Sequence, residues 1–387
     1  MMGHGRGIGQ PPSLAQQVAR HPAEASAEER LLWLCARVTL TGAALAEIQR
    51  LGATLGAAGW AQLAALAERN GVENLLFTHA MEAGLGPSLP EAVALRLRER
   101  FGAVTLTARR LERRLEALLP LLESNGAAAM TLKGASLARR CYGGVTLRPT
   151  TDIDLLVRPE DTPRWGAALR AAGFAPVMGR GDPLSGHALR FRELQFRDAS
   201  GLLAEAHLTL CRHPSYQQAF PLARIWANAQ SITINGVHSL SLALDDELRF
   251  LSLHYAVQHE ASRLIWLVDV AELLRARGAD LPWERLVDET IALGIAGPVA
   301  VTLLRAHALL DAPMPVWARE RLRAAAMTAS EQRAWAEAHT RMDDWRRFLA
   351  QTRALDTAGE QLRLLSSGGA SLSRRIFRAL GHHDSRH

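Results

Sequence analysis

One short passage, residues 126–157, constrains the fold of this 387-residue chain more than any other. It opens with a short apolar segment after an Asn-Gly pair, which is typical of a buried strand. A glycine, Gly134, then turns the chain into a helix predicted at 135–142, and a second apolar strand ends the passage. Because side chains alternate along a strand, Asp152 and Asp154 share one face of it. The passage therefore predicts a strand, a helix and a second strand that presents two neighbouring carboxylates.

The hydrophobic periodicity divides the rest of the chain. Before this passage, apolar residues recur every three or four positions, as in amphipathic helices. After it come a helix at 163–173 and two strands, 188–197 and 202–210, which a four-residue turn joins into an antiparallel hairpin. The helical period returns at 244–365, with Asp245 as the expected N-cap. We therefore predict an α+β fold, with a small mixed sheet and its helices flanked by N-terminal and C-terminal helical regions.

Composition shifts suggest where these regions begin and end. The first residues are rich in glycine and proline, and a Ser-Ser-Gly-Gly joint precedes an arginine-rich end. The predicted regions are a disordered leader at 1–25, an N-terminal helical region at 26–125, a central catalytic core at 126–243, a C-terminal helical domain at 244–366 and a flexible basic tail at 367–387.

The composition is that of a soluble globular protein, with 48% hydrophobic and 22% charged residues. No apolar run approaches the ~20 residues that cross a bilayer, and the N-terminus lacks the apolar segment of a signal peptide. Three widely spaced cysteines, Cys35, Cys141 and Cys211, suggest no disulfide framework. We therefore expect a cytoplasmic protein that does not insert into membranes.

Lys133 is the only lysine among the 45 lysine and arginine residues of the chain. Such a bias indicates that arginine has replaced lysine wherever a positive charge is enough. Lysine supplies a compact, strongly hydrated charge that docks on phosphate oxygens. Because Lys133 lies beside Gly134 and upstream of the Asp-x-Asp strand, we predict a chemical role for it.

The glycine turn and the two aspartates together point to phosphoryl-transfer chemistry. Two carboxylates on one strand face can bind one Mg²⁺ or two ions about 3.5–4 Å apart. Gly134 lets triphosphate oxygens approach backbone N–H groups at the positive end of the next helix, where Ser136 can add a hydroxyl contact. Arg148 either contacts a phosphate or a metal-bound carboxylate, or forms an ordinary ion pair with Asp152 or Asp154. The sequence leaves both roles open.

A third carboxylate is expected on a neighbouring strand, because a two-metal site usually needs one more ligand, which can also orient or deprotonate the nucleophile. Glu205 is the best candidate, since its strand is otherwise almost wholly apolar and an unpaired carboxylate there would be costly to bury. His207 lies on the same face and either binds metal or substrate or is an ordinary core histidine. The expected cofactor is Mg²⁺ or Mn²⁺, held by Asp152, Asp154 and Glu205.

These residues resemble the uncharacterised nucleotidyltransferases of the polymerase-beta-like superfamily, in which a Lys-Gly turn precedes an Arg and an Asp-x-Asp strand. The resemblance covers roughly residues 28–280 or more. It includes the strand with Glu205 and His207, and a helix with His254 followed by one that carries Asp269. It implies a polymerase-beta-like core and functional roles for His254 and Asp269.

The resemblance also implies that Asp152, Asp154 and Glu205 are the metal carboxylates and that Gly134 and Ser136 lie at the triphosphate. The chain differs from the superfamily in two ways. A Gly-Ala-Ser sequence stands where a Gly-Gly or Gly-Ser doublet is usual, and the stretch from Gly134 to Asp152 is longer than in many members.

The sequence thus favours a metal-dependent nucleotidyltransferase. Lys133, Gly134 and Ser136 would hold the β- and γ-phosphates of a nucleoside triphosphate, the co-substrate, while an acceptor hydroxyl attacks in line. A nucleoside monophosphate, most simply AMP, would move to the acceptor as pyrophosphate leaves. A small molecule or peptide is the expected acceptor.

Three other hypotheses stay open. The same site could attack the γ-phosphate, which would make the protein a kinase of a peptide or small molecule. The protein could also be a non-catalytic nucleotide-binding or toxin–antitoxin-type partner. Action on RNA has only the net charge of +6 and the pI near 10 in its favour.

Overall fold

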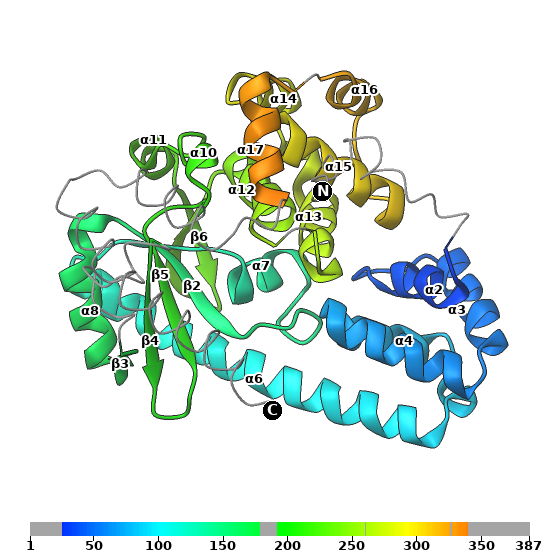
Figure 1. Ribbon diagram of the computed structural model, residues 1–387. Coiled ribbons are helices and arrows are strands. Elements are labelled where there is room, and N and C mark those ends of the chain that lie inside the picture. Colours follow the sequence, from blue (N-terminus) through cyan, green and yellow to red (C-terminus); the bar gives the residue numbers. More distant parts are fainter. Residues whose placement is uncertain (1–24, 179–191, 260, 326, 340–387) are drawn as a thin grey trace, which may run out of the picture.

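The computed structural model describes residues 25–178, 192–259, 261–325 and 327–339. It confirms the predicted α+β class, because one mixed sheet packs beside N-terminal and C-terminal groups of helices (Figure 1). The predicted basic tail and nearly all of the predicted leader lie outside the described residues, as does the beginning of the strand expected at 188–197.

Local sequence signals set the ends of the N-terminal helices. Ser26 caps α2 in a capping box with Glu29, in which each side chain accepts a hydrogen bond from the other residue's backbone N–H. Gly71 ends α4 in the left-handed conformation, with φ of +69°. These helices are α2 (Ala27–Cys35), α3 (Gly42–Thr54), α4 (Ala57–Asn70), α5 (Glu73–Glu82), the 3-10 turn η2 (Gly86–Ser88) and α6 (Glu91–Ser124).

Helix α6 joins the N-terminal helices to the sheet. Its 34 residues span about 50 Å at the usual rise of an α-helix. The first half packs Val93 and Leu97 into the core of the helical regions, whereas the second half packs Leu111, Leu115 and Leu118 into the core beneath the sheet. Figure 1 shows α6 running below both parts.

The described strands form one sheet in the order β3-β4-β5-β2-β1-β7-β6. The pairs β2–β5 and β1–β7 are parallel and the other pairs are antiparallel. The predicted order of strand, helix, strand and helix is confirmed by β1, α7, β2 and α8, and the predicted hairpin by β4 and β5. The strands are β1 (Ala129–Thr131), β2 (Asp152–Val157), β3 (Phe174–Pro176), β4 (Glu193–Asp198), β5 (Leu203–His207), β6 (Gln230–Ile234) and β7 (Val237–Ser241).

The β6–β7 hairpin was not expected from the strand pattern. Its turn consists of Asn235 and Gly236, whose φ angles of 48° and 85° are those of a type I′ turn.

Short helical elements lie between the strands along the chain. They are α7 (Gly134–Cys141), the 3-10 turn η3 (Pro159–Asp161), α8 (Thr162–Ala171), α10 (Pro214–Gln217) and α11 (Leu222–Ala227).

The described part of the C-terminal region is helical, as predicted, but its first helix begins differently. Helix α12 starts at Leu244 after Ala243, so Asp245 lies in the first turn rather than at the N-cap. Its carboxylate instead accepts hydrogen bonds from Arg249 and Arg285. The elements are α12 (Leu244–Leu253), the π-helical turn η4 (His254–Gln258), α13 (Leu264–Arg277), the 3-10 turn η5 (Gly278–Asp280), α14 (Trp283–Ala292), α15 (Ala296–Leu310), α16 (Val316–Ala324) and α17 (Ala329–His339).

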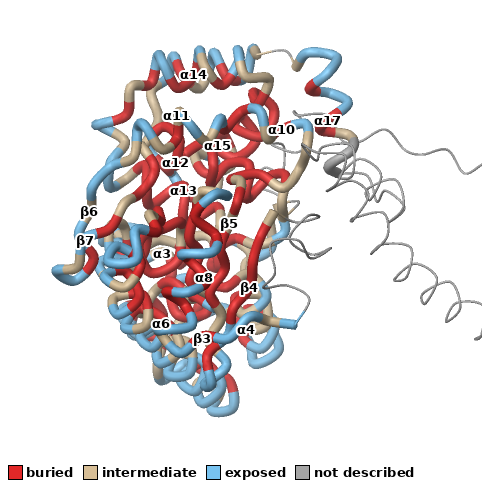
Figure 2. Tube along the Cα trace, turned by 90° about the vertical axis from the view of Figure 1, so that its left-hand side faces the viewer, coloured by how far each residue is buried: buried red, intermediate tan, exposed pale blue. Residues whose placement is uncertain are grey.

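Two apolar clusters hold these layers together. One joins the second half of α6, α8 and part of the sheet, and the other joins the N-terminal helices to α12, α13 and α15. Helix α13 is buried along nearly its whole length, and Figure 2 shows buried residues concentrated along α12, α13, α15 and the central strands. The N-terminal and C-terminal helices therefore share one core, although the sheet separates them in sequence.

Helix α8 is anchored on the sheet by Trp165, which is fully buried with its ring edge-on to Phe196 of β4 at 5.2 Å. We predict that Trp165→Ala lowers the free energy of unfolding by about 3–5 kcal/mol, since it leaves a cavity between helix and sheet. The matched Trp317→Ala change on the surface of α16 should cost less than about 1 kcal/mol. Urea denaturation of both variants tests this, and equal losses would contradict it.

Candidate functional site

The register of β2 and β5 places carboxylates side by side. Asp154 pairs with Glu205 across the parallel strands, and Asp152 lies two residues earlier on the same face. His207, two residues after Glu205, extends the same row. Asp154, Glu205 and His207 each offer a ligand atom, and these atoms lie within 4.8 Å of one another. The structure thus brings together the carboxylates singled out from the sequence.

Lys133 reaches this row from the turn between β1 and α7. Its Nζ lies 3.2 Å from Oδ2 of Asp154, and its side chain is 16% exposed. Gly134 follows with φ of +56°, a conformation that a residue with a Cβ rarely adopts. Burial disfavours the Lys133 ammonium, but the charges of Asp154 and Asp152 outweigh this effect and raise its pKa. The lone lysine is therefore a protonated cation inside the site.

The carboxylates of the row differ in their affinity for protons. Burial and the charge of Asp154 raise the pKa of Asp152 to about 6. Burial also acts on Asp154, but Lys133 and His207 outweigh it and hold its pKa well below the usual range. Burial and the charge of Glu193 raise the pKa of Glu205 to about 7. Asp154 is thus ionised at neutral pH. At Asp152 and Glu205, the nearby positive charges do not offset the effects of burial and of the neighbouring carboxylates.

His207 interacts with the carboxylates directly. Its Nε2 lies 2.8 Å from Oδ1 of Asp154 and 3.9 Å from Oε2 of Glu205, and its Nδ1 lies 3.9 Å from Oε2 of Glu193. The ring is therefore part of the polar site rather than packed in an apolar core.

The neighbouring strand β4 adds polar groups that the sequence analysis did not single out. Gln195 pairs with Glu205, and its Nε2 donates to Oε1 of both Glu193 and Glu205 at 2.8 Å. Glu193 also accepts a hydrogen bond from Arg212. The signal was the alternation of Glu193 and Gln195 with the apolar residues Leu194 and Phe196, which puts both polar side chains on one face. The site thus includes a fourth carboxylate and a second cation.

These groups open into a cavity of about 410 Å³ between the sheet and the C-terminal helices. Asp154 lies behind its wall and is 4% exposed. The lining residues are Lys133, Asp152, Glu193, Gln195, Glu205, His207, Thr209, Leu210, Arg212, Phe250, His254, Gln258 and His259.

The wall opposite the sheet is aromatic. A spacing of five residues separates His254 from His259, which in an α-helix would place the rings apart. The π-helical turn η4 widens the helix, so the ring centroids lie 4.5 Å apart. His259 stacks on Trp266 at 3.8 Å with an interplanar angle of 24°. His254 therefore lines the cavity together with a second histidine.

Arg148 and Asp269 lie together away from this cavity. The Arg148 guanidinium donates to both carboxylate oxygens of Asp269 at 2.7 Å, and the Tyr142 hydroxyl donates to the same carboxylate at 2.7 Å. All three side chains are buried. An ion pair with Asp152 or Asp154 was one of the two roles that the sequence left open for Arg148. The structure pairs Arg148 with Asp269 instead, because α13 packs against α7. This buried pair ties the loop before β2 to the C-terminal helices.

Ser136 also lies away from the cavity. It is fully buried in the first turn of α7 and does not line the cavity, and its Oγ has no hydrogen-bond partner among the residues that the structure describes.

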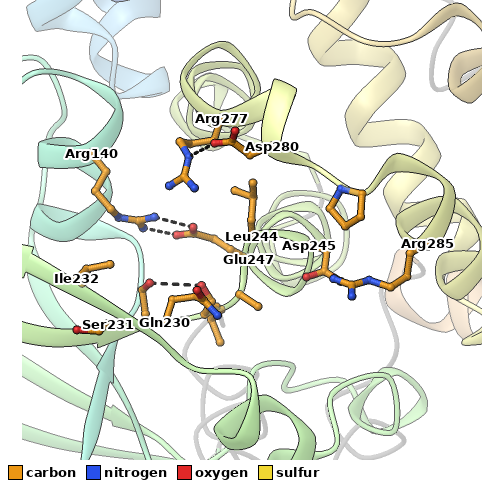
Figure 3. Close-up of a pocket in the computed structure, with 14 residues that line it drawn as sticks. Arg140, Gln230, Ser231, Ile232, Leu244, Asp245, Glu247, Arg277, Asp280 and Arg285 are labelled. Carbon is orange, nitrogen blue, oxygen red and sulfur yellow. Dashed lines mark hydrogen bonds and ion pairs between the residues drawn. The ribbon is translucent and has the colours of Figure 1, made fainter.

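A second cavity, of about 430 Å³, lies where α7, β6 and the start of α12 meet (Figure 3). Its charges neutralise one another in pairs: Arg140 with Glu247 and Arg277 with Asp280. Arg285 also lies 3.0 Å from Asp245. The cavity beside Lys133 differs, because its carboxylates exceed its cations.

The sequence matches the model of a family of uncharacterised nucleotidyltransferases over residues 56–311, which is most of the chain. The chain belongs to this family. Among curated proteins, none matches it. Within the described part of this nucleotidyltransferase, every helix is too short or too polar to span a bilayer.

The donor set of the nucleotidyltransferase fits a divalent cation. Nucleotidyltransferases generally use divalent metals, and carboxylate oxygens are the ligands that Mg²⁺ and Mn²⁺ prefer. The ligand atoms of Asp154, Glu205 and His207 are close enough together to hold a metal ion. The raised pKa values of Asp152 and Glu205 show that more positive charge would stabilise their ionised forms.

The pKa of Glu205 leads to a prediction about stability in the absence of metal. The folded protein keeps a proton on Glu205 up to about pH 7, whereas the unfolded chain loses it near its ordinary pKa. The free energy of unfolding therefore falls as the pH rises between these values, by at most about 3 kcal/mol from this group. Glu205→Gln removes the effect, so its stability relative to the wild type should increase between pH 4.5 and pH 8.

Urea denaturation at both pH values with a chelator present measures this difference. The exposed Glu284→Gln change is the matched control. If the free energy of unfolding depends on pH in the same way in the wild type and in Glu205→Gln, then Glu205 does not carry a proton in the folded protein at neutral pH.

We predict a large loss of stability when the Arg148–Asp269 pair is broken. Arg148→Ala should lower the free energy of unfolding by about 3–5 kcal/mol, because Asp269 would keep a buried charge without its main partner. The double variant Arg148→Met/Asp269→Leu should lose less stability than the sum of the losses from Arg148→Met and Asp269→Leu made singly. Additive losses in urea denaturation would show that the two side chains do not act as a pair.

Proposed function

We propose that this nucleotidyltransferase moves a nucleoside monophosphate from a nucleoside triphosphate to an acceptor hydroxyl. The observation that carries the proposal is the row formed by Asp152, Asp154 and Glu205 beside Lys133. Three carboxylates and one ammonium, which lie at the wall of one cavity or directly behind it, are suited to binding a metal–triphosphate complex rather than an apolar ligand.

Asp152, Asp154 and Glu205 would hold Mg²⁺ or Mn²⁺. The hydrogen bond from His207 would stabilise the ionised form of Asp154. When bound, the cation stabilises the negative charge that develops on the transferring phosphate and the leaving pyrophosphate. Lys133 would bind the phosphate oxygens through its ammonium group. Gly134 would bind them through its backbone N–H group at the N-terminus of α7.

The structure suggests different roles for the two other residues expected at the triphosphate. Arg148 is held by Asp269, so we propose that it positions the loop before β2 rather than contacting phosphate. Ser136 is buried in α7 and would support the turn from within. Arg212, which Glu193 holds at the cavity wall, is the second cation available to phosphate oxygens there.

In the proposed reaction the acceptor oxygen forms a bond to the α-phosphorus as the bond from that phosphorus to the pyrophosphate oxygen breaks. The acceptor gains the nucleoside monophosphate, most simply AMP, and pyrophosphate leaves. The hydroxyl proton passes to a nearby base. We propose Glu205 for this step because it lines the cavity beside the proposed metal, where a carboxylate can accept the proton of the attacking hydroxyl.

The test is incubation of the purified protein with α- and γ-labelled ATP, GTP, CTP and UTP, with Mg²⁺ or Mn²⁺ and a cell extract. We expect label from the α position in a product. Asp152→Asn/Asp154→Asn should lower the rate about 1,000-fold or more, since the metal supplies several kcal/mol of transition-state stabilisation. The exposed Asp288→Asn change should leave the rate unchanged, and circular dichroism checks that each variant is folded.

Other outcomes would replace the proposal. Transfer of label from the γ position alone would identify a kinase. Tight, metal-dependent nucleotide binding without transfer of either label would indicate a non-catalytic role.

A further inference from the structure

We propose that His259, stacked on Trp266, forms the platform on which the base of the nucleoside triphosphate lies. This inference rests on the proposed function, and it assigns a part of the cavity that the carboxylates and cations do not occupy. It makes a purine nucleotide the preferred co-substrate.

The platform is a stack built from two segments of the C-terminal region. The guanidinium of Arg263 lies 5.4 Å from the centroid of the Trp266 ring, and the His259 ring lies 3.8 Å from it, nearly parallel. His254 approaches both rings, at 4.5 Å from His259 and 5.3 Å from Trp266. Because neighbouring rings hold it, the His259 ring has one defined orientation at the cavity wall.

The backbone of η4 is shaped to present this ring. A π-helical turn is rare and occurs frequently at functional sites. Here it runs from His254 to Gln258 and ends at His259, and Ala261 closes it with φ of +54° and a 2.8 Å hydrogen bond from its N–H to the carbonyl of Tyr255. An ordinary α-helix would carry His259 away from His254 and from the cavity.

The two walls of the cavity differ in charge. On the sheet side lie Lys133 and the carboxylates, which suit phosphates and a metal. On the helix side, burial and the charges of Lys133 and Arg212 lower the pKa of His259 to about 3, and burial lowers the pKa of His254 well below its usual range. Both imidazoles are therefore neutral at pH 7, and an uncharged aromatic surface suits a base rather than a phosphate.

Stacking strength favours a purine. A purine has a larger and more polarisable π system than a pyrimidine and therefore stacks more strongly on an aromatic ring. The cavity volume of about 410 Å³ lies in the lower part of the range of small-molecule sites, about 300–1,000 Å³.

The test separates base contacts from phosphate contacts. Isothermal titration calorimetry with Mn²⁺ measures binding of α,β-methylene-ATP and of inorganic tripolyphosphate, which has no base. We expect His259→Ala to weaken binding of the nucleotide about tenfold, as for the loss of one stacking contact, and to leave tripolyphosphate unchanged. Lys133→Met should weaken binding of both ligands.

Two further variants complete the experiment. His259→Phe keeps an aromatic surface and should restore most of the nucleotide affinity, which excludes a folding defect as the cause. His238→Ala changes an exposed histidine on β7 and should have no effect. For the wild type, α,β-methylene-UTP should bind more weakly than α,β-methylene-ATP.

Equal weakening of both ligands by His259→Ala, or no weakening of either, would overturn the platform while leaving the proposed function intact. If wild-type protein binds tripolyphosphate and nucleotide equally well, the base makes no contact and the inference is also wrong. Failure of the wild type to bind either ligand would overturn the proposed function itself.

Discussion

The parallel pairing of β2 with β5 places Asp154 directly across from Glu205 in the interior of the protein. Like charges at this position repel, and burial removes most of the water that would screen them. The surrounding residues reduce this cost unequally. Lys133 and His207 stabilise the charge of Asp154, whereas Asp152 and Glu205 are left with raised pKa values. The fold therefore maintains an incompletely neutralised group of acids, which is the electrostatic condition for binding a cation tightly.

The helical regions hold this arrangement from a distance. The loop before β2 is tied to α13 by Arg148 and Asp269, and to the N-terminal helices by Asn74, whose Nδ2 donates to the carbonyl of Thr146 at 2.7 Å. Both helical regions thus fix the segment that leads into Asp152. Because the two helical regions also share one apolar core, a shift of the helices in either region can move this loop and, with it, the carboxylates of β2.

Much of the site could be predicted because its signals are local. The alternation in β2 puts Asp152 and Asp154 on one face, and Glu205 stood out as a carboxylate in an apolar strand. Glu193 and Gln195 carry the same kind of signal, but their role depends on the pairing of β4 with β5, which brings Gln195 to Glu205. The partner of Arg148 lies on a helix more than one hundred residues away, so no local pattern indicates it. The π-helical turn also depends on packing, because the spacing of its histidines fits no ordinary helical period. In contrast, Asn235 and Gly236 are a strong hairpin signal, so β6 and β7 were accessible from the sequence.

The place of Lys133 has a practical consequence for chemical labelling. An amine-directed reagent meets a single side-chain amine in the whole chain, besides the amine at its N-terminus. That amine lies against Asp154 with little of its surface exposed, and its raised pKa keeps it in the unreactive ammonium form. Its rate of acylation therefore reports whether the cavity is open or filled. Reductive methylation with a ¹³C-labelled reagent would give one side-chain NMR signal at the centre of the carboxylate row, without any engineered residue.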